Sequence, residues 1–373
     1  MKCFNPLLNI LVVFMILSCN RSSYNAEITY RVISEQSIAN FDSPNYLIPI
    51  NNFISGKNEG SKNSFFFENI MSRQMLKCNI FEDSIHLTNI SNIDSTIWPV
   101  NKLHKSTDLF YYFNHNTNRL SYQMTQGTVL QAYQLDQKYG LVNLLSGYEK
   151  HGSSSILLDN ASKTIGFGTT KERLYYYQKV KPLLMIDILP KGIEHKAFGI
   201  WPKEYVKTGN NYDDPYAKAC FGNNNHVCVS FGADHNLYLY NDTTLIYSKQ
   251  NKSNYINNFK AYPDEKQFDM LYLREYKQSE PKYMNLIFDP WEKMYYRTVR
   301  HSFLNATTEY EVKSFWSVIV TDDELNIVGE CKFSSQYDPN VFIPTPFGIL
   351  LMKGNHPDSK ERIFTLIKLF AHE

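Results

Sequence analysis

The chain has 373 residues, with 38 lysines and arginines against 37 aspartates and glutamates, and a mean hydropathy of −0.39. The balanced charge argues against a nucleic-acid partner, because binding a phosphate backbone needs an excess of positive charge. The hydropathy argues against a protein with many membrane spans, and 27 tyrosines with 24 phenylalanines carry more apolar area than a disordered chain would. Composition therefore predicts an aromatic-rich, β-dominated body.

The first residues have the pattern of a secretory signal. An apolar run from Leu7 to Leu17 is too short to span a bilayer, which takes about 20 residues. It ends at Ser18-Cys19, which looks like a lipobox, the sequence whose cysteine is acylated before cleavage. We expect residues 1–18 to be a signal peptide and residues 19–25 to be a tether lipidated at Cys19. The alternative is an ordinary signal peptide with an incidental cysteine.

The lipid on Cys19 would attach the protein to a membrane of the cell envelope. Acidic residues just after the lipidated cysteine act as surface-export signals in similar lipoproteins, and residues 20–25 contain none. We therefore expect an outer membrane lipoprotein that faces the periplasm.

A degenerate repeat runs through residues 26–373, which we expect to form one domain. Each copy is a short apolar and aromatic run, a turn with Asn or Asp, and a second alternating run. Such runs predict β-hairpins, because β-branched and aromatic side chains favour strands and Asn, Asp and Gly tolerate turn geometry. The copies begin at Ser64, Leu109, Ser155, Val227, Met284, Ser317 and, in divergent form, Gly348.

Repeated hairpins favour an all-β fold, a single β-propeller of six or seven blades. Seven is favoured, because about 350 residues then give about 50 per blade, near the length of known blade repeats. The strand Ala26–Ile33 is expected to complete the last blade beside Ile363–Phe370, which removes the open edges of the ring. A pair of β-sandwiches is the alternative.

Three central segments, with the lipobox, carry a family resemblance. They are Val229–His235, Lys252–Ile256 and Phe288–Arg297. In them the chain resembles the Bacteroidetes-type lipoproteins that carry a propeller-like domain of unknown function. The resemblance implies a propeller-like fold and an envelope lipoprotein over the whole mature chain, and it offers no catalytic residues to carry over.

Local catalytic motifs are absent from the sequence: it has no HExxH, G-x-S-x-G, Walker A, G-x-G-x-x-G or EF-hand pattern. We therefore expect no metal and no cofactor. His151 stands near Ser153, but neighbours in one loop rarely form a triad, and a polar loop is the favoured interpretation. Arg297 is expected to bridge to a neighbouring blade through an internal carboxylate rather than to bind a ligand.

The segment 201–221 is the candidate ligand-binding site, because it lacks strand periodicity and mixes aromatic with polar side chains. Flat apolar faces for stacking and directional hydrogen bonds are what a sugar or peptide ligand needs. The alternative is an inter-blade connection whose aromatic side chains cover a sheet. The candidate ligand-binding residues are Trp201, Tyr205, Tyr212, Asp213, Asp214 and Tyr216.

Cys220 and Cys228 bracket a turn rich in Gly and Asn, so a local disulfide is possible in an oxidising envelope. The alternative is a pair of buried small side chains on neighbouring strands.

These patterns favour a non-catalytic, membrane-anchored propeller that binds a glycan, peptide or protein. One alternative is a propeller hydrolase or lyase acting on a glycan or peptide, because dispersed catalytic residues leave no local motif. A second is a scaffold subunit of an envelope complex.

Overall fold

The computed structural model describes most of the chain from residue 26 onward. The described residues are 26–38, 47–52, 54–55, 64–69, 74–80, 85–92, 102–105, 109–114, 117, 119–124, 129–136, 143–150, 153–160, 168–189, 192–266, 268–301, 316–353 and 362–371. The expected signal peptide, Cys19, the tether and His151 lie outside them. Among the described residues, no helix is long and apolar enough to cross a membrane.

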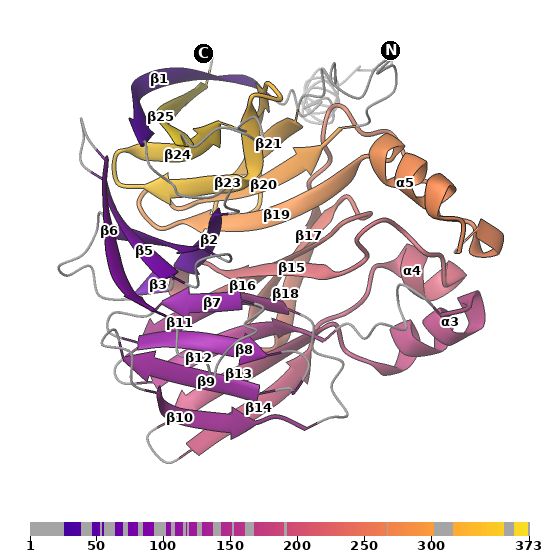
Figure 1. Ribbon diagram of the computed structural model, residues 1–373. Coiled ribbons are helices and arrows are strands. Elements are labelled where there is room, and N and C mark those ends of the chain that lie inside the picture. The colour runs from indigo at the N-terminus through magenta and orange to yellow at the C-terminus, as the bar shows by residue number, and fades with distance from the viewer. Residues whose placement is uncertain are drawn as a thin grey trace, which may run out of the picture.

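The described strands form six consecutive meanders of four antiparallel strands (Figure 1). The first three are β2 (Leu47–Asn52), β4 (Ser64–Asn69), β5 (Gln74–Ile80), β6 (Ile85–Asn92); β7 (Lys102–Lys105), β8 (Leu109–Asn114), β9 (Arg119–Met124), β10 (Val129–Gln134); and β11 (Asn143–Lys150), β12 (Ser153–Asp159), β13 (Leu183–Leu189), β14 (Gly192–Phe198). A two-residue strand, β3 (Ile54–Ser55), pairs with β11.

The fourth meander is β15 (Ala217–Phe221), β16 (His226–Phe231), β17 (Asn236–Asn241) and β18 (Thr244–Gln250). The fifth and sixth are β19 (Lys282–Asp289), β20 (Met294–Arg300), β21 (Trp316–Thr321), β22 (Ile327–Phe333); and β23 (Tyr337–Thr345), β24 (Gly348–Lys353), β25 (Arg362–Ala371) with β1 (Ala26–Ile38).

The first strands of the meanders contact one another in chain order. β2 contacts β7, which contacts β11, and the series continues through β15, β19 and β23 back to β2. The described part of the chain therefore runs once around a cycle of six neighbouring meanders. The sequence pattern favours seven blades over six, and the number of blades stays a prediction.

The N-terminal strand completes the sixth meander. β1 pairs antiparallel with β25, from Ile28 opposite Ala371 to Ile38 opposite Arg362. This confirms the predicted pairing of the terminal strands, which covers an edge of β25 that would otherwise be open.

In the part of the chain that the structure describes, three α-helices interrupt the strand pattern: α3 (Thr170–Lys179), α4 (Lys203–Thr208) and α5 (Met270–Ser279). The hairpin repeat did not predict them. α3 nevertheless carries a start signal in the sequence, since Thr169 and Glu172 form a capping box. Asp269 caps α5 by accepting a hydrogen bond from the backbone N–H of Tyr272 at 3.0 Å.

The core lies between neighbouring meanders. Tyr295 on β20 packs with Cys220 and Cys228 of the fourth meander, whereas Tyr296 packs against Phe342 of the sixth. The two neighbouring tyrosines therefore lie on opposite faces of their sheet, as the alternation of side chains along a strand requires. Most aromatic side chains in the described hairpins therefore serve packing between meanders.

Candidate functional site

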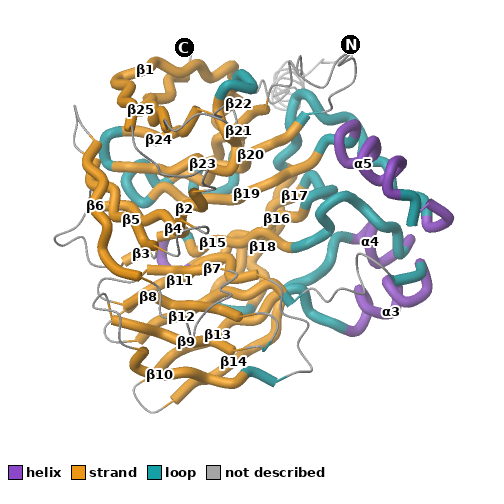
Figure 2. Tube along the Cα trace, in the orientation of Figure 1, coloured by secondary structure: helices purple, strands orange, loops and turns teal. Residues whose placement is uncertain are grey.

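The long connections of the third to fifth meanders lie on one side of the strands, and all three helices are in them (Figure 2). α3 joins β12 to β13, α4 joins β14 to β15, and α5 joins β18 to β19. We call the surface formed by residues 168–182, 199–216 and 251–281 the helical face. Loops on a rigid strand scaffold are where binding residues commonly lie.

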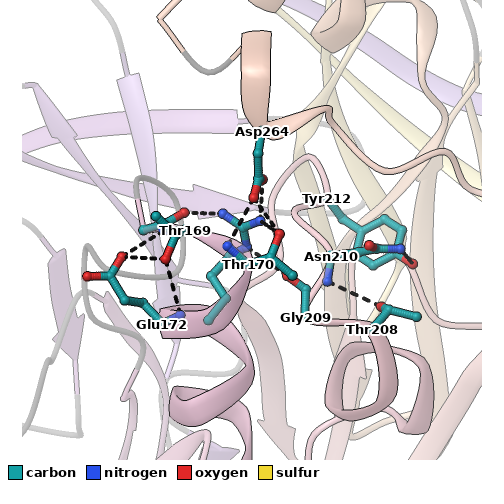
Figure 3. Close-up of polar contacts among 10 residues, drawn as sticks. Thr169, Thr170, Glu172, Thr208, Gly209, Asn210, Tyr212 and Asp264 are labelled. Atoms are coloured by element: carbon teal, nitrogen blue, oxygen red, sulfur yellow. Dashed lines mark hydrogen bonds and ion pairs between the residues drawn. The ribbon is translucent and has the colours of Figure 1, made fainter.

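A buried arginine, Arg173, joins the three connections of the helical face, and Figure 3 labels its partners Gly209, Thr170 and Asp264. Arg173 on α3 is 1% exposed; its Nε donates to the carbonyl oxygen of Gly209 at 2.8 Å, and its Nη2 pairs with the carboxylate of Asp264. The backbone N–H of Thr170 also donates to Asp264 at 2.9 Å, which places a negative charge at the N-terminus of α3. Burial raises the pKa of Asp264, but hydrogen bonds from Thr170 and Arg173 outweigh this and lower it.

Gly209 is needed at this junction for two reasons. Its φ is +64°, in the left-handed region, and a Cβ there would lie 2.6 Å from the carbonyl oxygen of Thr170. The close approach of α4 to α3 therefore depends on a residue without a side chain.

Three of the candidate ligand-binding aromatics are buried beneath the helical face. Trp201, Tyr205 and Tyr212 belong to the core cluster between the third and fourth meanders. The rings of Tyr205 and Tyr212 stack with centroids 4.9 Å apart, and Trp201 Nε1 donates to the carbonyl oxygen of Val180 at 2.7 Å. The expected exposed stacking surface is therefore wrong for these residues. The alternative, aromatics that cover a sheet, is what the structure shows.

Two other candidates, Asp213 and Asp214, meet basic side chains from distant segments. Asp213 Oδ2 lies 2.8 Å from Arg300 Nη2 and 3.1 Å from Lys282 Nζ. Asp214 Oδ1 lies 3.0 Å from Lys218 Nζ, and its Oδ2 lies 3.9 Å from Lys282 Nζ. We call these five residues the inner-rim cluster, because Lys218 and Lys282 belong to the first strands β15 and β19 at the helical face.

The inner-rim cluster is partly accessible to solvent. The side chains of Lys282, Arg300, Lys218 and Asp214 are 15% to 21% exposed, and that of Asp213 is 7% exposed. A ligand could therefore reach four of these charged groups without unfolding a meander.

The turn that carries the two aspartates is tightly packed. Asp214 has a φ of +57°, and its carbonyl oxygen would lie 2.3 Å from a Cβ at Gly232. Gly232 lies in the family-like segment Val229–His235, and its own carbonyl oxygen accepts from the backbone N–H of Tyr283 at 2.9 Å. Glycine is thus required at 232 to let the aspartate turn approach the fourth meander.

Tyr216, the last candidate, is only partly buried and lies beside the cluster. Burial, with added repulsion from Asp159 and Asp214, raises the pKa of its hydroxyl. The candidate segment is thus divided: Trp201, Tyr205 and Tyr212 fill the core, whereas Asp213, Asp214 and Tyr216 lie at its edge, where Asp214 is the more exposed of the two aspartates.

Cys220 and Cys228 lie directly opposite one another on β15 and β16. Both are buried and both thiols are free, so the possible disulfide is not formed in this structure. Burial raises the pKa of both thiols. This is the arrangement of the alternative interpretation, two small buried side chains on neighbouring strands.

Arg297 bridges two meanders, as predicted, but through carbonyl oxygens instead of a carboxylate. Its guanidinium donates to the carbonyl oxygens of Asn251 at 2.9 Å and Asp234 at 2.5 Å. The guanidinium also lies 3.3 Å from the centroid of the Tyr283 ring. The arginine is fully buried and has a structural role.

Sequence reasoning missed a buried chain of polar side chains near the helical face. His301 Nε2 lies 2.8 Å from Ser317 Oγ, which donates to Glu330 at 2.5 Å, and Ser253 Oγ donates to the same carboxylate oxygen at 2.7 Å. These residues come from four separate segments, so no local motif announces them. Metal ligation finds no support in the described chain, where no three His, Cys, Asp or Glu side chains are grouped to hold an ion.

This polar chain does not have the order of a catalytic triad. In a triad the histidine lies between the serine and the acid and takes the serine's proton. Here Ser317 lies between His301 and Glu330 and gives its proton to the carboxylate. Burial, with Lys332 nearby, lowers the pKa of His301 to about 4, so its neutral ring donates to Ser317 and does not activate it.

The chain is thus a mostly β protein of four-stranded meanders with a partly accessible charged cluster on its helical face. The family described as "Domain of unknown function (DUF4221)" matches residues 80–332, and the chain belongs to this family. A crystal structure of a member from Bacteroides vulgatus is similar, with 16% identity, a TM-score of 0.70 and coverage of 93% of this chain and 100% of that one. This likeness supports the fold.

Weaker likenesses extend to virginiamycin B lyase from Staphylococcus aureus (7% identity, TM-score 0.44, 90% of this chain and 99% of that one). The Pan2 WD40 domain from Neurospora crassa is similar to the same degree (8% identity, TM-score 0.44, 90% and 95% coverage). Likenesses at this level say nothing about activity. No protein of curated function matches the sequence.

Proposed function

We propose that the protein is a six-bladed β-propeller that binds a polar ligand, without catalysis, at the inner-rim cluster. The cycle of contacts among the first strands and the β1–β25 pairing support a closed ring. We further propose that a lipid on Cys19 holds the propeller at the outer membrane, facing the periplasm, on the strength of the lipobox pattern.

The inner-rim cluster is the observation that carries the proposal. Ion pairs of this kind contribute little to stability, and well-packed apolar residues would often stabilise a partly buried position equally well. The structure nevertheless brings Lys218, Lys282 and Arg300 together with two carboxylates at an accessible position. The three basic side chains offer hydrogen-bond donors and the two carboxylates offer acceptors. This combination suits a glycan or peptide with several polar groups.

The absence of catalysis is part of the proposal. His301 has a low pKa and donates to its serine, and the pKa of His235 is lowered to about 4 by burial and by Arg297 and Lys252. His301 is buried and His235 is partly buried, and one ring nitrogen of each contacts a protein hydroxyl, so these neutral imidazoles are poorly placed to exchange protons with a ligand.

The test is a glycan and peptide array probed with the purified full-length protein. A ligand retained by the native chain should bind at least about 10-fold more weakly to Lys282→Gln, which equals about 1.4 kcal/mol. Lys218→Gln, which removes one ion pair, is the second variant in case the first does not fold. Lys277→Gln on the exposed side of α5 is the matched control and should bind like the native chain.

The outcomes separate the alternatives. Conversion of a retained ligand, seen by mass spectrometry, would favour the hydrolase or lyase. Retention of a protein alone, unaffected by either lysine variant, would favour the scaffold subunit. For the anchor, Cys19→Ala should move the protein from the membrane fraction to the supernatant; unchanged sedimentation with the membrane would contradict lipidation.

A further inference from the structure

Two basic side chains of the inner-rim cluster lie opposite one another on neighbouring strands. Lys282 is the first residue of β19, and in the antiparallel register of β19 and β20 its partner is Arg300. Like charges placed directly opposite one another destabilise a sheet. Asp213 contacts both side chains, but its single carboxylate offsets only one of the two charges. Stability alone therefore does not favour this placement.

The two carboxylates of the cluster are already paired. Asp213 contacts Arg300 and Lys282, and Asp214 contacts Lys218 and Lys282. The most buried member is also a carboxylate, because the side chain of Asp213 is only 7% exposed. The accessible charges are therefore those of three cations and one carboxylate, so a ligand that balances the cluster must be negative.

Arg300 keeps hydrogen-bond donors for such a ligand. Its Nη2 donates to Asp213 at 2.8 Å and to the carbonyl oxygen of Glu280 at 2.9 Å. Its Nε donates to no acceptor in the part of the chain that the structure describes. A guanidinium carries five N–H donors and matches the two oxygens of a carboxylate. Because its side chain is 19% exposed, Arg300 can bind a second carboxylate beside Asp213.

The wider helical face adds to this positive charge. Among its exposed side chains, lysines and arginines outnumber aspartates and glutamates by nine to five. The excess is local, because the whole chain has 38 basic against 37 acidic side chains. A surface of one predominant sign attracts partners of the opposite sign and speeds their encounter, an effect that salt weakens.

The buried aromatic side chains decide between a peptide and a glycan. Trp201, Tyr205 and Tyr212 belong to the same segment as the two aspartates, and all three lie in the core. They therefore offer no flat apolar surface on which a sugar could stack. We propose that the inner-rim cluster binds a peptide with acidic side chains, an inference that rests on the proposed binding function and names the class of its ligand.

Two peptides that differ only in charge test the inference. Both are acetylated and amidated hexamers, in which glycine alternates with glutamate in one and with glutamine in the other. Isothermal titration calorimetry measures their binding to the full-length protein. We expect the glutamate peptide to bind at least about 10-fold more tightly than the glutamine peptide. Added salt should reduce this difference, because it screens the attraction between exposed charges.

Lys282→Gln tests whether the inner-rim cluster causes the preference. This variant should reduce the advantage of the glutamate peptide by about threefold, as expected for one partly exposed ion pair. Lys277→Gln removes the same charge from the exposed side of α5 and should leave the advantage unchanged. Lys218→Gln is the second variant if circular dichroism shows that Lys282→Gln does not fold. An equal reduction in Lys277→Gln would assign the preference to the general charge of the helical face and would overturn the inference.

The remaining outcomes separate this inference from the proposed function. Equal binding of the two peptides, weakened in Lys282→Gln, would leave the proposed function standing and overturn the acidic ligand. Tighter binding of oligogalacturonate than of the glutamate peptide would identify an acidic glycan as the ligand and also overturn the inference. If neither lysine variant weakens the binding of any peptide or glycan, the proposed function fails as well.

Discussion

Two ionic groups lie on the helical face, and they differ in how completely their hydrogen-bonding capacity is used. Arg173 is 1% exposed, and all three of its nitrogens donate to Gly209, Gly168, Thr170 or Asp264. In the inner-rim cluster, Lys282 lies near two carboxylates only and remains 15% exposed. A buried cation whose nitrogens all donate to protein oxygens holds chain segments together. An accessible cation that keeps unused N–H donors can bind a ligand.

Of the substitutions considered for the two ionic groups, removal of Arg173 should cause the largest loss of stability. Arg173→Met should reduce the free energy of unfolding by about 3 kcal/mol, because it leaves the buried Gly209 carbonyl without this donor and the Asp264 carboxylate without its cation. Urea denaturation followed by circular dichroism measures this change. Lys171→Met, at an exposed position of the same helix, should change it little, and equal losses in the two variants would contradict a structural role specific to Arg173.

Acid should weaken the buried polar chain of His301, Ser317 and Glu330. The pKa of His301 is about 4 in the folded protein, below its usual 6.5, so the unfolded chain binds this proton first as pH falls. Stability is therefore present above about pH 6.5 and is lost between pH 6.5 and 4, by on the order of 3 kcal/mol. Melting temperatures across this range measure the loss, and His301→Gln should make the curve less steep without flattening it, because the pKa of His235 is also lowered to about 4. An unchanged slope in that variant would show that another group titrates.

Gly232→Ala should disturb the inner rim through packing alone. The new Cβ would meet the Asp214 carbonyl oxygen at 2.3 Å, so the aspartate turn must move, at about 1–3 kcal/mol. Thermal unfolding gives the stability change and the ligand array gives the affinity change. Native affinity in this variant would argue against a ligand that contacts Asp214.

The smallest stability effect is expected for Lys218→Gln. Its ion pair with Asp214 is partly exposed, so the free energy of unfolding should change by less than about 1 kcal/mol. The same change should still weaken ligand binding. If Lys218→Gln lowered the stability but left ligand binding unchanged, the inner-rim cluster would have the structural role that we assign to Arg173.

The hairpin repeat and the closing strand were predictable because both are local or terminal patterns. The runs that begin at Ser64, Leu109 and Ser317 coincide with β4, β8 and β21. The helices escaped the repeat analysis because α3 and α5 lie in insertions that do not recur.

The sequence by itself determined the strand-rich body and the pairing of its two terminal strands. Only the tertiary structure decided which side chains of the segment 201–221 are buried and which are accessible. From the sequence alone, Trp201, Tyr205 and Tyr212 cannot be told from exposed aromatic residues that stack on a ligand. In the structure they fill the space between two meanders, which close packing requires large apolar side chains to occupy. The partners of Asp213 and Asp214 come from β15, β19 and β20. Spacing along the chain cannot reveal such contacts, because packing between blades creates them.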